Sequence, residues 1–153
     1  MRKQQVKTFF VKTYGCQMNE LDTEIMVGLL EKRGLKRVLE EDQADLFIAN
    51  TCSIRDLAER KAFGKIGRMG KNFLERPVIG ITGCMAMAKK DSLFRKLPHV
   101  DFVLGTNNIN DLNEVLDEVL LTGKKTIRTV DQFEENLDYL AAKRHLLVLI
   151  LPT

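Results

Sequence analysis

The chain has 153 residues, enough for one domain with a single hydrophobic core. Its hydrophobic fraction of 44% and charged fraction of 29% are those of an ordinary globular protein, which excludes disorder along the whole chain. The net charge of +3 permits contact with nucleic acid without requiring it. The sequence shows neither a secretory signal nor an apolar run long enough to cross a membrane, so we expect a cytoplasmic protein with no membrane partner.

Apolar runs alternate with amphipathic stretches in chain order, beginning with a predicted strand over residues 6–11. The helix that follows, to about residue 33, carries apolar residues at helical spacing: Leu21, Ile25, Leu29 and Leu30. The pattern repeats three times, with strands over residues 46–49, 78–81 and 100–104, and helices over about 53–76, 86–97 and 109–121.

Four strand–helix units of this kind indicate an α/β fold with a doubly wound, Rossmann- or flavodoxin-like sheet. The strands read as continuous apolar runs, which is typical of a parallel sheet buried on both faces. We therefore predict about four to five parallel strands, helices on both faces and right-handed crossovers. Residues 1–125 are expected to form this domain. Residues 126–153, which begin with a polar stretch, are expected to form a linker and the start of a further segment.

Cys16, Cys52 and Cys84 are far apart in sequence, yet each follows one of the first three predicted strands. The carboxyl ends of parallel strands share one edge, so we expect the three thiols to meet there. Three thiolates in a reducing compartment favour a soft metal, and iron–sulfur clusters take thiolate ligands. Gly15 and Gly83, each directly before a cysteine, would allow tight backbone turns beside a bulky ligand. These residues alone leave open the alternative that the three cysteines are simply small, buried hydrophobic side chains.

Other residues allow both a functional and a structural interpretation. Asn19 and Asn50 flank the cysteine loops, where they would bond a cluster or order the loops, or act only as cap and turn residues. The second helix is basic, which fits contact with tRNA phosphates or, as we favour from sequence, a solvated face. Its basic residues are Arg55, Arg60, Lys61, Lys65, Arg68 and Lys71. His99 and His145 lack zinc-ligand spacing and are expected at the surface.

Each cysteine lies in a distinctive motif. The motifs are TYGCQMNE over residues 13–20, NTCSIR over residues 50–55 and GITGCMA over residues 80–86. Together they resemble the signatures of the radical S-adenosylmethionine methylthiotransferase family, over about residues 5–125. The residues after Cys16 are closest to the tRNA-modifying branch of that family.

The resemblance implies that Cys16, Cys52 and Cys84 hold an auxiliary [4Fe-4S] cluster, and that this domain contributes no catalytic residue. It implies a full-length enzyme that adds a methylthio group to dimethylallyladenosine beside the anticodon of tRNA, with sulfur or cluster donor proteins as candidate partners. S-adenosylmethionine and a second [4Fe-4S] cluster belong to a radical domain with a CxxxCxxC motif. This chain has no cysteine left for that motif, so we expect a chain truncated before the radical domain and not catalytically competent alone.

Functions from other classes are also considered. The chain alone would be a cluster-binding or interaction module, or an inactive remnant. A phosphatase or arsenate reductase of similar topology needs an arginine six positions after its cysteine, where this sequence has Asp22, Ala58 and Lys90. Flavin or dinucleotide binding would need a phosphate loop or a GxGxxG motif, and the sequence contains neither.

Overall fold

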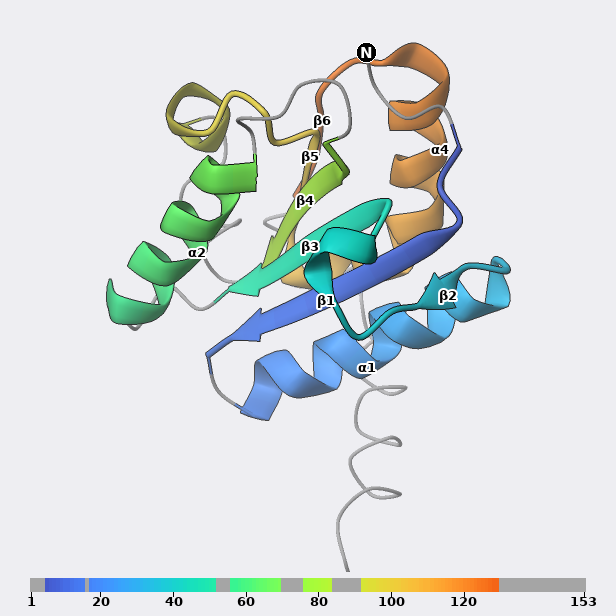
Figure 1. Cartoon of the computed structure of the whole chain (residues 1–153), viewed down its shortest axis with the longest axis horizontal. Helices are drawn as coiled ribbons and strands as arrows, with labels where there is room; N and C mark the ends of the chain where they lie inside the picture. The colour runs from blue at the N-terminus through green and yellow to red at the C-terminus, as the bar shows by residue number, and fades with distance from the viewer. Residues whose placement is uncertain (1–4, 16, 52–55, 70–75, 84–91, 130–153) are drawn as a thin grey trace, which may run out of the picture.

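The computed structural model describes residues 5–15, 17–51, 56–69, 76–83 and 92–129 (Figure 1). Within them, six parallel strands form one sheet in the order β2-β1-β3-β4-β5-β6. The strands are β1 (Thr8–Tyr14), β2 (Lys36–Arg37), β3 (Leu46–Thr51), β4 (Val78–Gly83), β5 (Phe102–Leu104) and β6 (Thr126–Arg128). The helices are α1 (Gln17–Lys32), α2 (Asp56–Met69) and α4 (Leu112–Thr122), with 3-10 turns η1 (Glu41–Gln43) and η2 (Thr106–Asp111) and a helical stretch over residues 92–96.

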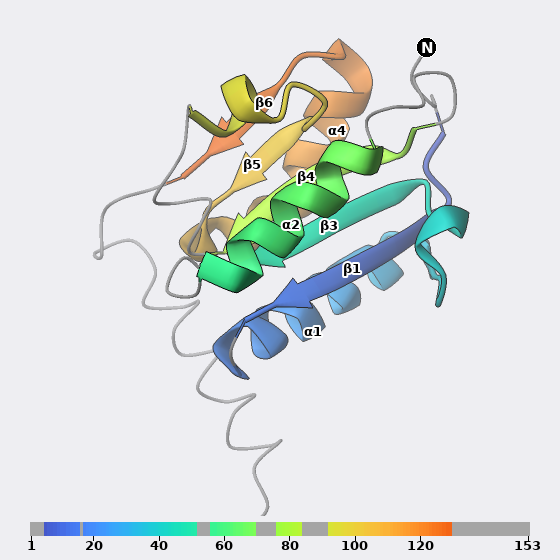
Figure 2. The ribbon, with the colours of Figure 1, turned by 60° about the vertical axis from the view of Figure 1, so that its left-hand side comes forward.

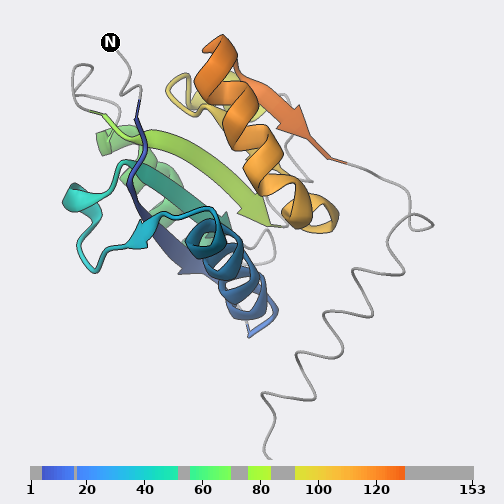
Figure 3. The same cartoon turned by 90° about the vertical axis from the view of Figure 1, so that its right-hand side faces the viewer.

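Helices cover both faces of the sheet. On one face lie α1 and α4 (Figure 3), and Leu30 of α1 and Ile48 of β3 belong to the same buried cluster. On the other face lie α2 and residues 92–96 (Figure 2), and Ile66 of α2 and Ile79 of β4 belong to a second buried cluster. Successive strand residues point to opposite faces, so a continuous apolar run fills both cores. The predicted doubly wound α/β fold is confirmed.

Two short strands make the sheet larger than the predicted four or five strands. β2 consists of two exposed basic residues, and β6 has three residues, so neither carries the apolar run that identifies a buried strand. β6 begins at Thr126 and pairs with β5, so the sheet continues past residue 125. The division of the chain into residues 1–125 and 126–153 stays a prediction.

The crossovers do not all have the same hand. α2 leads from β3 to β4 on one face, whereas α4 leads from β5 to β6, in the same direction across the sheet, on the opposite face. These two crossovers therefore have opposite hands, and the prediction that all are right-handed is wrong. Contacts with α1 hold α4 on its face: Asn113 Nδ2 donates to the Leu29 carbonyl at 3.2 Å, and Arg33 pairs with Asp117.

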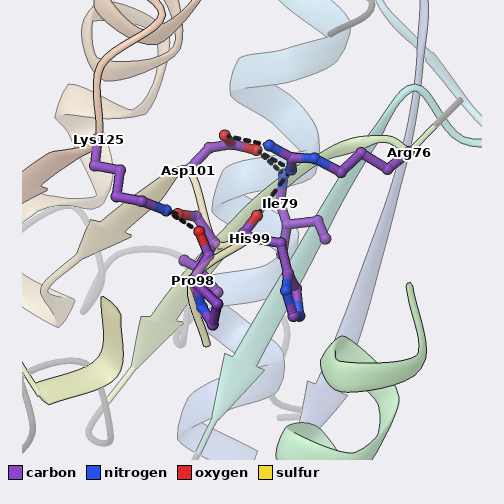
Figure 4. Close-up of polar contacts among 7 residues, drawn as sticks. Arg76, Ile79, Pro98, His99, Asp101 and Lys125 are labelled. Carbon is purple, nitrogen blue, oxygen red and sulfur yellow. Dashed lines mark hydrogen bonds and ion pairs between the residues drawn. The ribbon is translucent and has the colours of Figure 1, made fainter. Parts of the chain in front are cut away.

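A buried ion pair joins the chain ahead of β4 and β5 at the amino edge of the sheet (Figure 4). The fully buried carboxylate of Asp101 accepts hydrogen bonds from Arg76 Nη1 at 3.0 Å and from the Ile79 N–H at 3.0 Å. Arg76 Nη1 also donates to the His99 carbonyl at 2.8 Å, and Lys125 donates to backbone carbonyls of the same segment. These bonds fix the amino ends of the strands, opposite the edge where the cysteine motifs lie.

In the part of the chain that the structure describes, every helix falls short of the length and apolarity needed to cross a bilayer. The expected cytoplasmic location and the expected lack of a membrane partner stay predictions.

Candidate functional site

β1, β3 and β4 end side by side at the carboxyl edge of the sheet. Tyr14 of β1 pairs with Thr51 of β3, which in turn pairs with Gly83 of β4. The chain continues from these ends to the motif cysteines, Cys16, Cys52 and Cys84. The boundary between β1 and β3 is also a switch point, because β1 leads to α1 on one face and β3 leads to α2 on the other. Open α/β sheets bind ligands at this kind of position.

A buried network of amide and hydroxyl groups ties α1 to the ends of β1 and β3. Asn50 Nδ2 donates to the Asn19 carbonyl at 2.6 Å and to Thr23 Oγ1 at 2.9 Å. Asn19 Nδ2 donates to Asn50 Oδ1 at 3.1 Å and to the Thr51 carbonyl at 3.0 Å. The hydroxyls of Thr13 and Thr23 are 2.7 Å apart. Because Asn19 and Asn50 are buried, these bonds fix the first turn of α1 relative to the end of β3.

Gly83 ends β4 in a conformation that favours glycine, with a φ of 97°. A Cβ atom there would lie 2.2 Å from the Thr51 carbonyl oxygen and 2.9 Å from Asn50 Oδ1. Beside it, the Thr51 hydroxyl donates to the Thr82 carbonyl at 2.9 Å. A residue with a side chain would force β3 and β4 apart, so glycine permits the close approach of these strands directly before positions 52 and 84.

The electrostatics of this edge suit an anionic ligand. α1 begins at Gln17 and α2 at Asp56, so two helix N-termini follow the ends of β1 and β3. Helix N-termini carry partial positive charge, which stabilises thiolates and other anions. Thr82 Oγ1, one residue before the end of β4, is buried and has no hydrogen-bond partner among the described residues.

Of the predicted site residues, the structure describes the two asparagines. Cys16, Cys52 and Cys84 lie outside the described residues, and their role as ligands stays a prediction. Asn19 lies inside α1 and Asn50 inside β3, so the interpretations as cap and turn residues are wrong, and both amides order the strand ends. The sequence does not single out Thr13 and Thr23. Their position inside or beside the first motif is the only signal for them.

Metal-binding clusters outside the cysteine loops receive no support. The described residues contain no group of three or more His, Cys, Asp and Glu that could hold a metal ion, but none of the three cysteines is among them. His99 is half-buried, and its Nε2 atom has no hydrogen-bond partner within the described part of the chain. Partial burial lowers the pKa of His99, and its intermediate exposure is compatible with the expected position at the surface. His145 lies outside the described residues.

Comparison with known proteins decides the family. A family model described as "Uncharacterized protein family UPF0004" matches residues 8–105, more than half of the chain. The chain belongs to this family. A protein named tRNA-2-methylthio-N(6)-dimethylallyladenosine synthase, from Protochlamydia amoebophila, is 70% identical to it over 139 residues. Synthases of the same name from Dictyoglomus thermophilum and Akkermansia muciniphila are 39% and 44% identical over 140 and 113 residues.

The UPF0004 match and these relatives confirm the resemblance to methylthiotransferases that the three motifs indicate. The alignments cover 91%, 89% and 72% of this chain, in the order given, but only 31%, 31% and 25% of the relatives. The chain therefore spans about a third or less of the length of the curated relatives that it matches.

Tyr14, in the first motif of this UPF0004 chain, is expected to titrate abnormally. Burial, with a smaller contribution from Glu41, raises the pKa of Tyr14 from 10.0 to about 12. Folding then favours the neutral phenol, so the Tyr14 contribution to stability is present below pH 10 and is lost as the pH rises towards about 12. Ultraviolet absorbance titration of the wild type and Tyr14→Phe, with circular dichroism to monitor folding, measures this. A Tyr14 transition near its ordinary pKa in folded protein would contradict the expectation.

Proposed function

We propose that this chain is the iron–sulfur domain of a tRNA methylthiotransferase, in which Cys16, Cys52 and Cys84 hold a [4Fe-4S] cluster. The observation that carries the proposal is the in-register meeting of β1, β3 and β4 directly before the three cysteine positions. The names of the relatives supply the substrate class, because each is a tRNA-2-methylthio-N(6)-dimethylallyladenosine synthase.

The described residues around the strand ends fit such a group. Iron–sulfur clusters take thiolate ligands, and the chain has three cysteines, one after each of these strands. The positive ends of α1 and α2 would stabilise thiolates and the negative charge of a cluster. The buried hydroxyl of Thr82 is a donor of the kind that bonds cluster sulfur and tunes its reduction potential.

With three protein ligands, a four-iron cluster supplies one iron that is open to an external ligand. The residues of this chain would hold and orient the group. S-adenosylmethionine and a second cluster require further cysteines, which these 153 residues do not contain. Methylthio transfer to dimethylallyladenosine then belongs to a longer, cytoplasmic enzyme, and this chain alone is not catalytic. The partners of that enzyme would be sulfur or cluster donor proteins.

Anaerobic reconstitution with iron and sulfide is expected to load about four irons per chain. Each of Cys16→Ala, Cys52→Ala and Cys84→Ala is expected to lose most of this iron, because each removes one of three thiolate ligands. Chemical iron and sulfide determination, with visible and spin-resonance spectra, measures the result.

Lys36→Ala, on the exposed strand β2, is the matched control and is expected to retain the wild-type iron content. Circular dichroism verifies that all variants fold. Folded wild-type protein without specific iron would overturn the proposal. Equal iron in the wild type and the cysteine variants would show adventitious binding, with the same consequence.

A further inference from the structure

The helices on the two faces of the sheet differ in the charges that they expose, although the acidic turn η1 also contacts α2 through the pair between Glu41 and Lys65. From residue 60 to its end, α2 carries only basic charges: Arg60, Lys61, Lys65 and Arg68. The helical stretch at residues 92–96 adds two exposed cations on the same face, Arg95 and Lys96. The helices on the other face present exposed carboxylates, Glu20, Glu24 and Glu31 on α1 and Glu114, Asp117 and Glu118 on α4. The small net charge of +3 conceals this division.

Three cations on the outside of α2 lack carboxylate partners among the described residues, as do the exposed Lys32 of α1 and Lys36 and Arg37 of β2. Arg60, Lys61 and Arg68 are exposed and form no ion pair with any carboxylate of the described residues. Elsewhere the structure pairs Arg33 with Asp117, Arg76 with Asp101 and Arg128 with Glu114 and Glu118. Lys65 pairs with Glu41 of the acidic turn η1, so we leave it out of the free set. Unpaired like charges repel one another, and they attract anionic partners.

The free cations form a stripe along α2, which lies across the outside of the sheet in Figure 2. Lys61 and Arg68 are seven residues apart, which places them on the same side of the helix and about 10 Å apart along its axis. Gly64 lies between them. A Cβ atom there would have only the Arg68 guanidinium within 4 Å, at 3.6 Å. A ligand can therefore approach the helix backbone closely at Gly64, between these two cations.

We propose that this stripe, defined by Arg60, Lys61, Gly64 and Arg68, binds the phosphate backbone of an RNA. The choice of RNA rests on the proposed function, whereas the charge and the geometry do not. α2 begins directly after the segment that contains Cys52, so the stripe extends from the carboxyl edge of the sheet. The basic sequence alone favours a solvated face. The run of exposed cations along α2 and residues 92–96, set against the exposed carboxylates of α1 and α4, reverses that preference.

Fluorescence anisotropy of a labelled RNA hairpin, titrated with the 153-residue chain at several salt concentrations, tests the proposal. Three phosphate contacts predict a slope of about −2 to −3 for the logarithm of affinity against the logarithm of salt concentration. The triple variant Arg60→Glu, Lys61→Glu, Arg68→Glu is expected to weaken binding by about tenfold or more and to flatten this slope. The neutral triple variant with Gln at the same positions is expected to lose less affinity, and it repeats the test if charge reversal unfolds the chain.

The matched control is Lys32→Glu, Lys36→Glu, Arg37→Glu, which changes the net charge equally at exposed positions of α1 and β2. The affinity of this control for the hairpin is expected to stay within about twofold of the wild-type value, because the control removes only long-range attraction. Equal losses in both triple variants, or no hairpin binding by the wild type, would overturn the proposal. So would tighter binding of polyglutamate than of the hairpin, which would assign the face to an acidic protein. Iron content is a separate readout, so failure here is distinguishable from failure of the cluster proposal.

Discussion

Gly83→Ala is expected to destabilise the protein by roughly 3–5 kcal/mol, from backbone strain together with overpacking. The φ of 97° is strained for any residue with a side chain, and the new Cβ atom would lie 2.2 Å from the Thr51 carbonyl oxygen. To relieve this contact, β3 and β4 must separate, which breaks the bond from the Thr51 hydroxyl to the Thr82 carbonyl. Urea unfolding measures the loss. The fraction that still folds is expected to bind less iron on reconstitution, because the chain before positions 52 and 84 has shifted.

Gly28→Ala provides the control for this prediction. Gly28 is exposed in the middle of α1, and a Cβ atom there would meet nothing within 4 Å. Alanine is expected to stabilise the helix by about 0.5–1 kcal/mol, so the two glycine substitutions should act in opposite directions. If Gly83→Ala proves as stable as the wild type, β3 and β4 do not approach as closely as described.

The sequence predicts the parts of the fold that follow from local pattern. Continuous apolar runs identify β1, β3, β4 and β5, and helical spacing of apolar residues identifies α1 and α4. β2 cannot be found this way, because its only residues are the exposed Lys36 and Arg37 at the sheet edge. The face that α4 covers depends on tertiary contacts such as the bond from Asn113 to the Leu29 carbonyl. No periodicity within α4 encodes such a contact.

The site is predictable in position but not in its internal bonding. That the three strand ends meet follows from a general property of parallel sheets, and the structure brings Tyr14, Thr51 and Gly83 into register. The reciprocal bonds between Asn19 and Asn50 join residues 31 positions apart, and they exist only once α1 packs on the sheet. The expected tight backbone at Gly83 is confirmed, and the neighbouring strand β3 crowds it.

Asp101→Asn is expected to destabilise the protein by about 3 kcal/mol, because it leaves a nearly buried guanidinium without its carboxylate. The Asp101 side chain is 0% exposed and that of Arg76 is 12% exposed, so water solvates the orphaned charge poorly (Figure 4). Asparagine retains an oxygen that can accept the Ile79 N–H bond, so the loss reports mainly on the ion pair. Adding Arg76→Met removes the unpaired charge and is expected to restore most of the stability. Urea unfolding of the wild type, both single variants and the double variant measures the coupling.

The exposed pair between Arg33 and Asp117 supplies the comparison, because the Asp117 side chain is 56% exposed. Asp117→Asn is expected to lower the free energy of unfolding by about 1 kcal/mol or less, since water and salt screen an exposed pair. Equal costs for Asp101→Asn and Asp117→Asn would contradict the assignment of a buried, strongly coupled pair at the amino edge. Asp101→Asn protein that remains folded is expected to bind iron like the wild type, because the ion pair lies at the edge opposite the strand ends that precede the cysteines in sequence. A specific loss of iron in that variant would instead show that the two edges of the sheet are coupled.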